Sequence, residues 1–310
     1  MKVLVTGTRG FLGTHLVRAL EAEGYEVFPF VGDILNLEMM LPQFNGLDGV
    51  FHVAGAMSSS PKEEKDRDRL FRVNVEGVKN IIQACSEKNI PRLVHVSSVV
   101  AVGTNLHKSD PLLCESSINI TKNLNFANYD SKRIGEELVL EAARHGKINA
   151  VVVNPGLIYG AGDAKKIIRK GNVRAARGKL PFYTSGGVNI VAVEDVTAGM
   201  IAAFKKGKNG DRYLLTGDNI TIKELLTTIS TLAGAKPPSM VLPDGFIKFL
   251  AAFSDYLGFK SKLCRENIFS ATTFHWYDNS KARAELNFNP RSYREALKAS
   301  VEWMKENNYL

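Results

Sequence analysis

The chain has 310 residues, of which 45% are hydrophobic and 23% are charged, and its net charge is +8. This composition is ordinary for a soluble globular protein with a large core. The three widely spaced cysteines indicate neither a disulfide framework nor a cysteine metal site, which fits a reducing cytosol. No apolar run reaches the length of a membrane span, so we expect a cytoplasmic protein without a membrane partner.

The first predicted element is a strand that ends in a glycine-rich turn. Residues 1–13 form a nearly continuous apolar run that ends in three glycines spaced three apart, and residues 14–24 then show helical spacing. Gly7 permits the sharp turn, Gly10 lets a ligand approach the backbone, and Gly13 lets the helix pack on the sheet. Because free N–H groups and the positive end of the helix dipole meet here, the stretch predicts a dinucleotide pyrophosphate site.

The second predicted strand, residues 26–31, bears on the choice of cofactor. An acid at its tip would bind the adenosine ribose hydroxyls and select NAD, but the tip is the apolar Val31. Asp33, two residues later, either takes that role or meets the adenine edge. Arg9, inside the glycine turn, either pairs with a 2′-phosphate or is simply an exposed turn residue. We therefore predict NADP as the preferred cofactor and NAD as the alternative.

Two further buried strands are predicted to end at the same edge of a parallel sheet, where ligands of open α/β sheets bind. Residues 47–55 end in Ala54 and Gly55, which are small enough for a cofactor to lie across them. Residues 92–98 end in Ser98, whose hydroxyl either hydrogen-bonds a substrate carbonyl or caps the following turn. An amphipathic helix is predicted between these strands, over residues 70–87.

A later helix, predicted over residues 126–140, carries Tyr129, Lys132 and Arg133 within one turn. A lysine ammonium beside a tyrosine favours the phenolate, which makes the phenol a usable acid at neutral pH. The next strand, residues 148–153, is expected to break at Asn154 and Pro155. A strand at residues 188–193 and a helix at 194–204 are then expected to return to the sheet.

Two segments bear on the substrate. Residues 164–179 carry basic side chains and no acid, so they form either a solvated helix face or an anion-attracting rim for a nucleotide-linked substrate. The absence of a groove-reading pattern argues against nucleic acid. Residues 246–259 are apolar, and they either pack as a helix of a small domain or accept a bulky hydrophobic alcohol or ketone.

These motifs together resemble the extended short-chain dehydrogenase/reductase superfamily, in its NAD(P)-dependent epimerase/dehydratase and dihydroflavonol-reductase-like group. The resemblance spans nearly the whole chain. It rests on residues 6–13, 50–55, 74–77 and 96–98, on Ser131 and Lys132 with Glu136, and on residues 154–156, 186–189 with 195–196, and 279–283 with Pro290.

The resemblance implies an α/β fold with a Rossmann-type, doubly wound parallel sheet (residues 1–154 and 188–210) and a smaller, mainly helical substrate domain (residues 155–187 and 211–310). It implies a homodimeric NAD(P)-dependent oxidoreductase or epimerase/dehydratase that acts on a small-molecule carbonyl or alcohol through Ser98, Tyr129 and Lys132. The expected cofactor contacts are Gly7, Thr8, Arg9, Gly10, Phe11, Leu12, Gly13, Asp33, Ile34, Ala54, Gly55, Lys132 and Pro155.

The chain departs from the family pattern at one position. The family tyrosine lies four residues before the lysine, where this chain has Asn128, whereas Tyr129 lies three before. On a helix the two offsets differ by ~100° in direction and ~1.5 Å in rise. Either Tyr129 still reaches the site with Lys132, or it pairs with Arg133, or the site lacks a phenol. The last case favours a non-catalytic NAD(P)-binding regulator or sensor.

Overall fold

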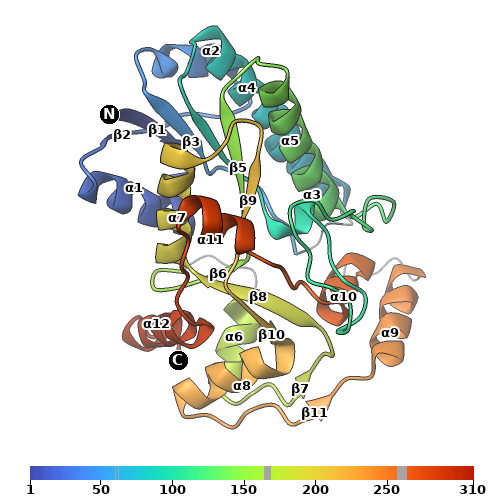
Figure 1. The fold of residues 1–310 in the computed structure, drawn as a ribbon. Helices are drawn as coiled ribbons and strands as arrows, with labels where there is room; N and C mark the ends of the chain where they lie inside the picture. Colours follow the sequence, from blue (N-terminus) through green and yellow to red (C-terminus); the bar gives the residue numbers. More distant parts are fainter. Residues whose placement is uncertain (60, 62, 164–168, 257–263) are drawn as a thin grey trace.

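The computed structural model describes residues 1–59, 61, 63–163, 169–256 and 264–310. Its main sheet has six parallel strands in the order β2-β1-β3-β4-β5-β9 (Figure 1). These strands are β1 (Lys2–Thr6), β2 (Glu26–Pro29), β3 (Gly49–His52), β4 (Leu93–Val96), β5 (Ala150–Pro155) and β9 (Arg212–Leu215).

Helices cover both faces of this sheet, because its buried side chains alternate between the faces. Val3 and Val5 contribute to one core, and Leu4 between them contributes to the other. The helices are α1 (Phe11–Ala22), α7 (Val193–Lys206) and α11 (Ser280–Leu286) on the first face, and α4 (Gly77–Glu87) and α5 (Ala127–Arg144) on the second. This arrangement is the predicted doubly wound α/β fold of Rossmann type.

The strand order places a crevice at the carboxyl end of β1. From β1 the chain moves to β2 on one side and then returns to β3 on the other side. Helix α2 (Leu37–Met40) and a 3-10 turn (Leu41–Phe44) make this return connection. Ligands of open α/β sheets bind where the strand order reverses in this way. The glycine turn that follows β1 lies at this point.

The helix predicted over residues 70–87 is longer than expected and irregular. It begins as α3 (Glu64–Phe71), passes through a π-helical turn (Arg72–Glu76) and continues as α4. The π-helical turn contains the buried Asn74, and such turns are frequent at functional sites.

A smaller mixed region follows β5 and forms the lower half of the molecule (Figure 1). One sheet has the order β10-β8-β6, and a second pairs β11 with β7. Its elements are β6 (Leu157–Tyr159), β7 (Phe182–Tyr183), β8 (Gly187–Ala192), β10 (Asp218–Thr221), β11 (Met240–Val241), α6 (Arg169–Ala176), α8 (Ile222–Ala233), α9 (Asp244–Tyr256), α10 (Arg265–Thr272) and α12 (Tyr293–Glu306).

Two strands lie in the opposite region from the one expected. Residues 187–192 pair within the small sheet, whereas residues 212–215 pair with β5 as the sixth strand of the main sheet. Tyr213 and Leu215 explain the second placement, because both are fully buried in the core beneath α7. The expected strand break at Asn154 and Pro155 is also wrong, since both residues pair with β9.

Some predicted features lie outside the described residues. Lys165 and Lys166 of the basic stretch belong to residues 164–168, and the apolar segment ends within residues 257–263. Among the helices that the structure describes, none combines the length and the apolar character that a bilayer crossing needs.

Candidate functional site

The glycine turn is shaped by two close backbone contacts. Gly7 has a φ of +72°, and a Cβ on it would lie 2.8 Å from the backbone nitrogen of Ala54. A Cβ on Gly13 would collide with the carbonyl oxygen of Gly7 and lie 2.8 Å from its carbonyl carbon. Only glycine therefore fits at either position without moving α1 or β3.

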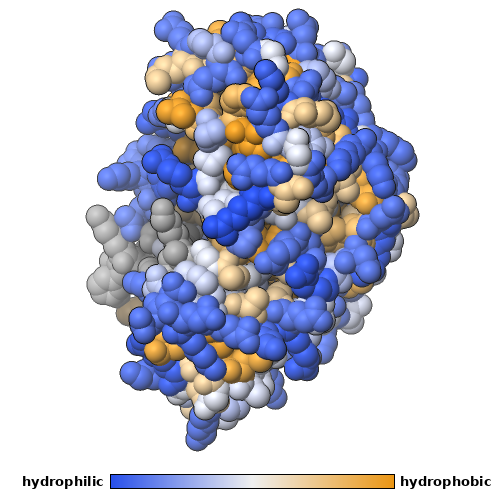
Figure 2. All heavy atoms as spheres, turned by 90° about the vertical axis from the view of Figure 1, so that its left-hand side faces the viewer, coloured by the Kyte–Doolittle hydropathy of each residue, from blue (hydrophilic) through white to orange (hydrophobic). Residues whose placement is uncertain are grey.

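The start of α1 is open to an anion. Gly10 is the N-cap and offers no side-chain hydrogen bond, and the first turn has no acidic residue. A cavity of about 410 Å³ beside this helix start has basic side chains and no acid in its lining, which is Arg9, Gly10, Phe11, Thr14, His15, Arg18, Ala161, Gly162 and Trp303. Figure 2 shows this side of the molecule, whose surface is mostly hydrophilic. The turn, the helix dipole and the arginines together suit a pyrophosphate.

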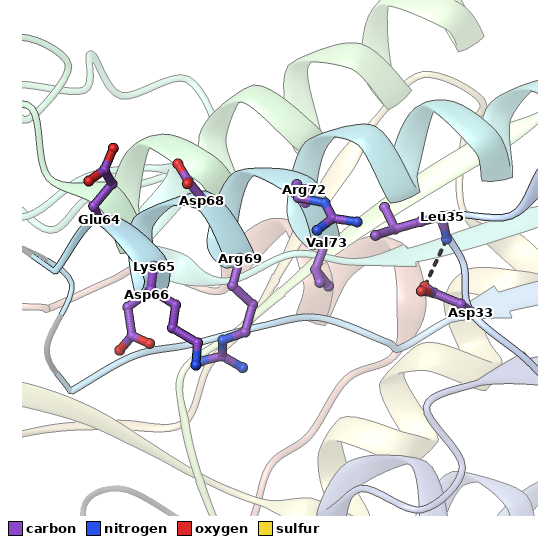
Figure 3. Close-up of a pocket in the computed structure, with 9 residues that line it drawn as sticks. All are labelled: Asp33, Leu35, Glu64, Lys65, Asp66, Asp68, Arg69, Arg72 and Val73. Atoms are coloured by element: carbon purple, nitrogen blue, oxygen red, sulfur yellow. Dashed lines mark hydrogen bonds between the residues drawn. The ribbon is translucent and has the colours of Figure 1, made fainter.

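A second cavity, of about 670 Å³, lies beyond the end of β2 (Figure 3). Asp33 lines it, and one oxygen of its carboxylate accepts a hydrogen bond from the Leu35 backbone at 3.0 Å. Arg69 and Arg72 come to the same cavity from α3 and the π-helical turn. Ile34, by contrast, is buried and would touch a side chain at Gly77. Arg9 and Asp33 thus line different cavities.

Hydrogen bonds connect the segment after β3 to β1 and to the π-helical turn. The hydroxyl of Thr6 accepts hydrogen bonds from the backbone N–H groups of Val53 and Ala54, both at 3.0 Å. The side-chain amide of Asn74 bonds the N–H group and the carbonyl of Ala56, at 2.8 and 2.9 Å. The segment containing Ala54 and Gly55 is therefore held in one position. The sequence placed Asn74 on a helix but gave it no such role.

Lys132 lies against this segment. A Cβ on Gly55 would be 2.7 Å from the Lys132 Nζ, so the glycine makes room for the ammonium. Burial lowers the pKa of Lys132 to about 8, and the neighbouring Glu136 carboxylate partly opposes that shift. Glu136 itself is bonded to Arg212 Nη1 at 2.8 Å. Among the described residues Lys132 Nζ has no hydrogen-bond partner, so its protons remain available to a ligand.

Two buried histidines lie beside Lys132. Burial, followed by repulsion from the Lys132 ammonium, lowers the pKa of His52 to about 3. The pKa of His95 is lowered by the same two causes together with repulsion from His52. The two rings stack with centroids 5.2 Å apart, and Thr6 bonds Nδ1 of His52 at 2.8 Å. Both histidines are therefore neutral packing residues.

Ser98 lies at the carboxyl end of β4, where the sequence placed it. It is the N-cap of a 3-10 turn (Val99–Ala101), and its hydroxyl accepts a 3.4 Å hydrogen bond from the backbone N–H group of Val100. Its carbonyl accepts a hydrogen bond from Asn154 at 3.0 Å. The neighbouring Ser97 hydroxyl is buried and has no hydrogen-bond partner in the described chain. The hydroxyl of Ser98 thus makes one weak bond and can reorient.

Tyr129 points toward the small region. Its hydroxyl lies 3.4 Å from Nε2 of His275, and its ring is 4% exposed. Burial raises the pKa of Tyr129 and lowers that of His275 to about 4, so both side chains are neutral. In the described part of the chain this hydroxyl makes no hydrogen bond to Ser98 or Lys132. Arg133 pairs with Asp130 and Glu137 instead of with Tyr129.

Asn128 occupies the position at which the family has its tyrosine. Its side-chain amide accepts from the Ser58 N–H group at 2.9 Å and donates to the Ser58 carbonyl at 3.0 Å. The backbone N–H group of Asn128 also donates to the Glu266 carboxylate at 3.1 Å. The side chain therefore joins α5 to the loop after β3.

Known proteins resemble this chain over most of its length. A family model described as "NAD dependent epimerase/dehydratase family" matches residues 3–216. The chain is 32% identical over 338 residues to the "Putative dihydroflavonol 4-reductase" of Synechocystis, with 99% of this chain and 95% of that protein covered. It is 29% identical over 333 residues to the "Sterol demethylase protein B" of Methylococcus capsulatus, with 99% of each covered.

A solved structure shares the fold. The nucleoside-diphosphate-sugar epimerase PA4631 of Pseudomonas aeruginosa superposes with a TM-score of 0.80 at 23% identity, with 100% of this chain and 99% of that chain covered.

Proposed function

Because this chain belongs to the NAD-dependent epimerase/dehydratase family, we propose that it is an NADP-dependent reductase of a hydrophobic ketone, or the corresponding alcohol dehydrogenase. The observation that carries the proposal is the position of Gly55 and Lys132 beside the glycine turn. The turn suits a pyrophosphate, and the Lys132 ammonium, which has no hydrogen-bond partner among the described residues, lies beside the small residues that follow β3. The family implies NAD or NADP as cofactor, and the choice of NADP is part of our proposal.

The residues around the turn fit such a cofactor. The N–H groups at the start of α1, from Phe11 and Leu12, would hold the phosphates, and Asp33 would meet the adenine half. Ala54, Gly55 and Pro155 would border the nicotinamide half, with Lys132 donating to the ribose hydroxyls. When bound, the cofactor supplies or accepts a hydride at its nicotinamide ring.

The chain's own groups would handle the oxygen of the substrate. Tyr129 is neutral, as a proton donor must be, and its hydroxyl would exchange the long contact with His275 for the substrate oxygen. The Ser98 hydroxyl would hold the same oxygen after releasing the Val100 N–H group. Lys132 would fix the position of the ribose and favour the phenolate that remains after proton transfer.

The substrate class is proposed from the relatives' names. Dihydroflavonol and sterol are hydrophobic ring systems, and the two full-length relatives carry these words in their names. We therefore favour the hydrophobic ketone.

Replacement of Tyr129 by phenylalanine tests the reaction. We expect a loss of turnover of about a hundredfold or more, because the proton donor is removed, with little change in NADPH affinity. The assay is NADPH oxidation with a panel of hydrophobic ring ketones. Tyr159→Phe is a matched control, since Tyr159 is equally buried and bonds Asn172 in the small region. Full turnover of the Tyr129 variant would contradict the assignment.

A second candidate function rests on Asn128. Because its amide both accepts from and donates to the Ser58 backbone, the position of the family tyrosine holds a structural side chain. A protein that binds NADPH and uses the bound state as a signal would need no phenol. This function is favoured if the wild-type protein binds NADPH but oxidises none of it with the ketone panel.

Arg9 is the proposed reader of the 2′-phosphate. We expect Arg9→Ala to weaken NADPH binding by roughly tenfold and to leave NADH binding nearly unchanged, because a charge-assisted hydrogen bond to phosphate is lost. Titration calorimetry with both cofactors measures this. Arg18→Ala is the control, since Arg18 lines the same cavity from the second turn of α1. An equal change in both affinities for Arg9→Ala would show that Arg9 does not select NADP.

A further inference from the structure

Polar side chains of the small region surround the Tyr129 hydroxyl. This hydroxyl lies 3.4 Å from Nε2 of His275, and the hydroxyl of Ser270 lies 3.3 Å from the same nitrogen. Ser270 belongs to α10, and His275 follows shortly after the end of that helix. Phe269 of α10 packs against Phe126, the N-cap of α5, with ring centroids 5.2 Å apart. Helix α10 therefore brings a serine and a histidine to the start of α5.

The backbone around His275 is fixed from two sides. The N–H group of His275 donates to the carbonyl of Gly187, the first residue of β8, at 3.0 Å. The preceding Phe274 exchanges two hydrogen bonds with Asn105, in the loop after β4, and both are 2.9 Å long. The His275 side chain is itself buried. The imidazole ring therefore has little freedom to move away from Tyr129.

The other ring nitrogen faces the turn that begins at Ser98. Nδ1 of His275 lies 3.5 Å from the hydroxyl of Tyr277. This hydroxyl donates to the carbonyl of Gly103 at 2.7 Å and lies 3.3 Å from the carbonyl of Val99, the residue that follows Ser98. Through Tyr277, the imidazole therefore connects the position of the Tyr129 hydroxyl to the turn that carries Ser98.

A buried phenol that gives up a proton needs a partner both before and after the transfer. A neutral imidazole has one donor and one acceptor nitrogen, and a hydroxyl can bond to either. Burial lowers the pKa of His275 to about 4, so the ring is neutral. Burial raises the pKa of Tyr129, and a hydrogen bond from Ser270 opposes that rise. The serine can therefore donate to the phenolate oxygen.

The lengths of these contacts allow the phenol to change partner. Both contacts to Nε2 of His275 are longer than an ideal hydrogen bond, so neither of them is strong. When the Tyr129 hydroxyl turns to another oxygen, the Ser270 hydroxyl is still within reach of the ring nitrogen. The buried imidazole is then not left without a partner, and the exchange costs little.

We propose that Ser270 and His275 are positioning residues for Tyr129, which fix the place of its hydroxyl and support the phenolate that proton transfer leaves. The inference rests on the proposed function, in which Tyr129 gives its proton to the carbonyl oxygen and NADPH gives its hydride to the carbonyl carbon. Asn128 stands where the family has its tyrosine. Support from the small region would therefore serve a tyrosine that is displaced by one residue.

Turnover of His275 variants tests the proposal, with NADPH oxidation measured on the hydrophobic ring ketone that the wild type reduces fastest. His275→Leu should lower kcat by about tenfold to a hundredfold and leave NADPH affinity unchanged, because the phenol loses its fixed place. His275→Gln should stay within about threefold of the wild type, since its amide can bond the same hydroxyl. Asn172→Leu is the matched control, because it removes the partner of the equally buried Tyr159 and should leave kcat unchanged.

The same substitution in the Tyr129→Phe protein separates positioning from a general structural role. There, His275→Leu should cause no further loss of turnover, because the hydroxyl on which it acts is already gone. A further loss as large as in the wild-type background would overturn the proposal, and so would a His275→Leu protein with wild-type kcat. Full turnover of the Tyr129→Phe protein by itself would instead refute the proposed function.

Ser270→Ala keeps the proposal testable if His275→Leu fails to fold. We expect kcat to fall by about tenfold, because the phenolate loses a hydrogen-bond donor. In protein labelled with ¹³C at the tyrosine Cζ atoms, this variant should also shift the resonance of Tyr129, which Tyr129→Phe identifies by its loss. Asn172→Leu should shift the resonance of Tyr159 instead. An unchanged Tyr129 resonance together with wild-type kcat in Ser270→Ala would contradict the proposal.

Discussion

Replacement of Gly13 by alanine is expected to abolish cofactor binding and to destabilise the protein. The added Cβ would collide with the Gly7 carbonyl oxygen and lie 2.8 Å from its carbonyl carbon. Because both contacts are with backbone, α1 must move away from the turn, at a cost of about 1–3 kcal/mol. We expect NADPH affinity to fall by about a hundredfold or more, since the N–H groups at the helix start move with α1.

Titration calorimetry and thermal unfolding measure the two effects of Gly13→Ala. Gly171→Ala is the matched control, because a Cβ at this position in α6 meets no atom of the described residues within 4 Å. That variant should bind NADPH normally and be equally or slightly more stable. If Gly13→Ala kept wild-type affinity, the close approach of α1 to the turn would have no part in binding.

Replacement of Lys132 by methionine is expected to remove activity while it stabilises the protein without cofactor. Turnover should fall by about a thousandfold, because the ribose loses its hydrogen-bond donor. At neutral pH the variant should nevertheless melt at a higher temperature than the wild type. The lowered pKa of Lys132 means that folding buries its charge at a cost, and methionine removes that charge.

The sign of the pH dependence follows from the same pKa. Lys132 releases its proton near pH 8 in the folded protein and near pH 10.5 in the unfolded chain. Below pH 8 both states are protonated and the cost of burial is fully present. Between these values only the unfolded chain keeps the proton, so wild-type stability rises with pH. The advantage of Lys132→Met should therefore be largest near pH 7 and disappear toward pH 10.5.

Thermal unfolding across this pH range checks the second prediction. Lys147→Met is the control, since Lys147 is an exposed lysine just after α5. A Lys132 variant that is less stable than the wild type at pH 7 would mean that the ammonium is stabilised by contacts other than Glu136.

The sequence predicted the fold and the glycine turn because both depend on local patterns. The apolar run, the three glycines and the helical spacing all lie within the first 24 residues. The close backbone contacts of Gly7 and Gly13 follow from this local pattern. The π-helical turn at Arg72–Glu76 was not predictable, because one extra residue per turn hardly disturbs the helical spacing of Val73, Val75 and Val78. The placement of residues 187–192 in the small sheet and of residues 212–215 in the main sheet depends on which side chains are buried. The periodicity of the sequence does not show this.

The surroundings of Tyr129 were beyond sequence reasoning for a different reason. His275 is 146 residues away along the chain, and nothing local announces the contact. The sequence shows that the tyrosine is displaced by one position from the family pattern, but it does not show where the Tyr129 side chain points. The role of Asn128 as a bridge to Ser58 likewise appears only in three dimensions. The assignment of Ser98, Tyr129 and Lys132, the preference for NADP and the homodimer stay predictions.

The most direct measurement is a titration of the purified wild-type protein with NADPH and with NADH. We predict saturable binding with a micromolar dissociation constant for NADPH and weaker binding of NADH. If a well-folded sample bound neither cofactor at millimolar concentration, the first turn of α1 would not be a diphosphate site. The roles proposed for Lys132, Tyr129 and Ser98 would then have no basis.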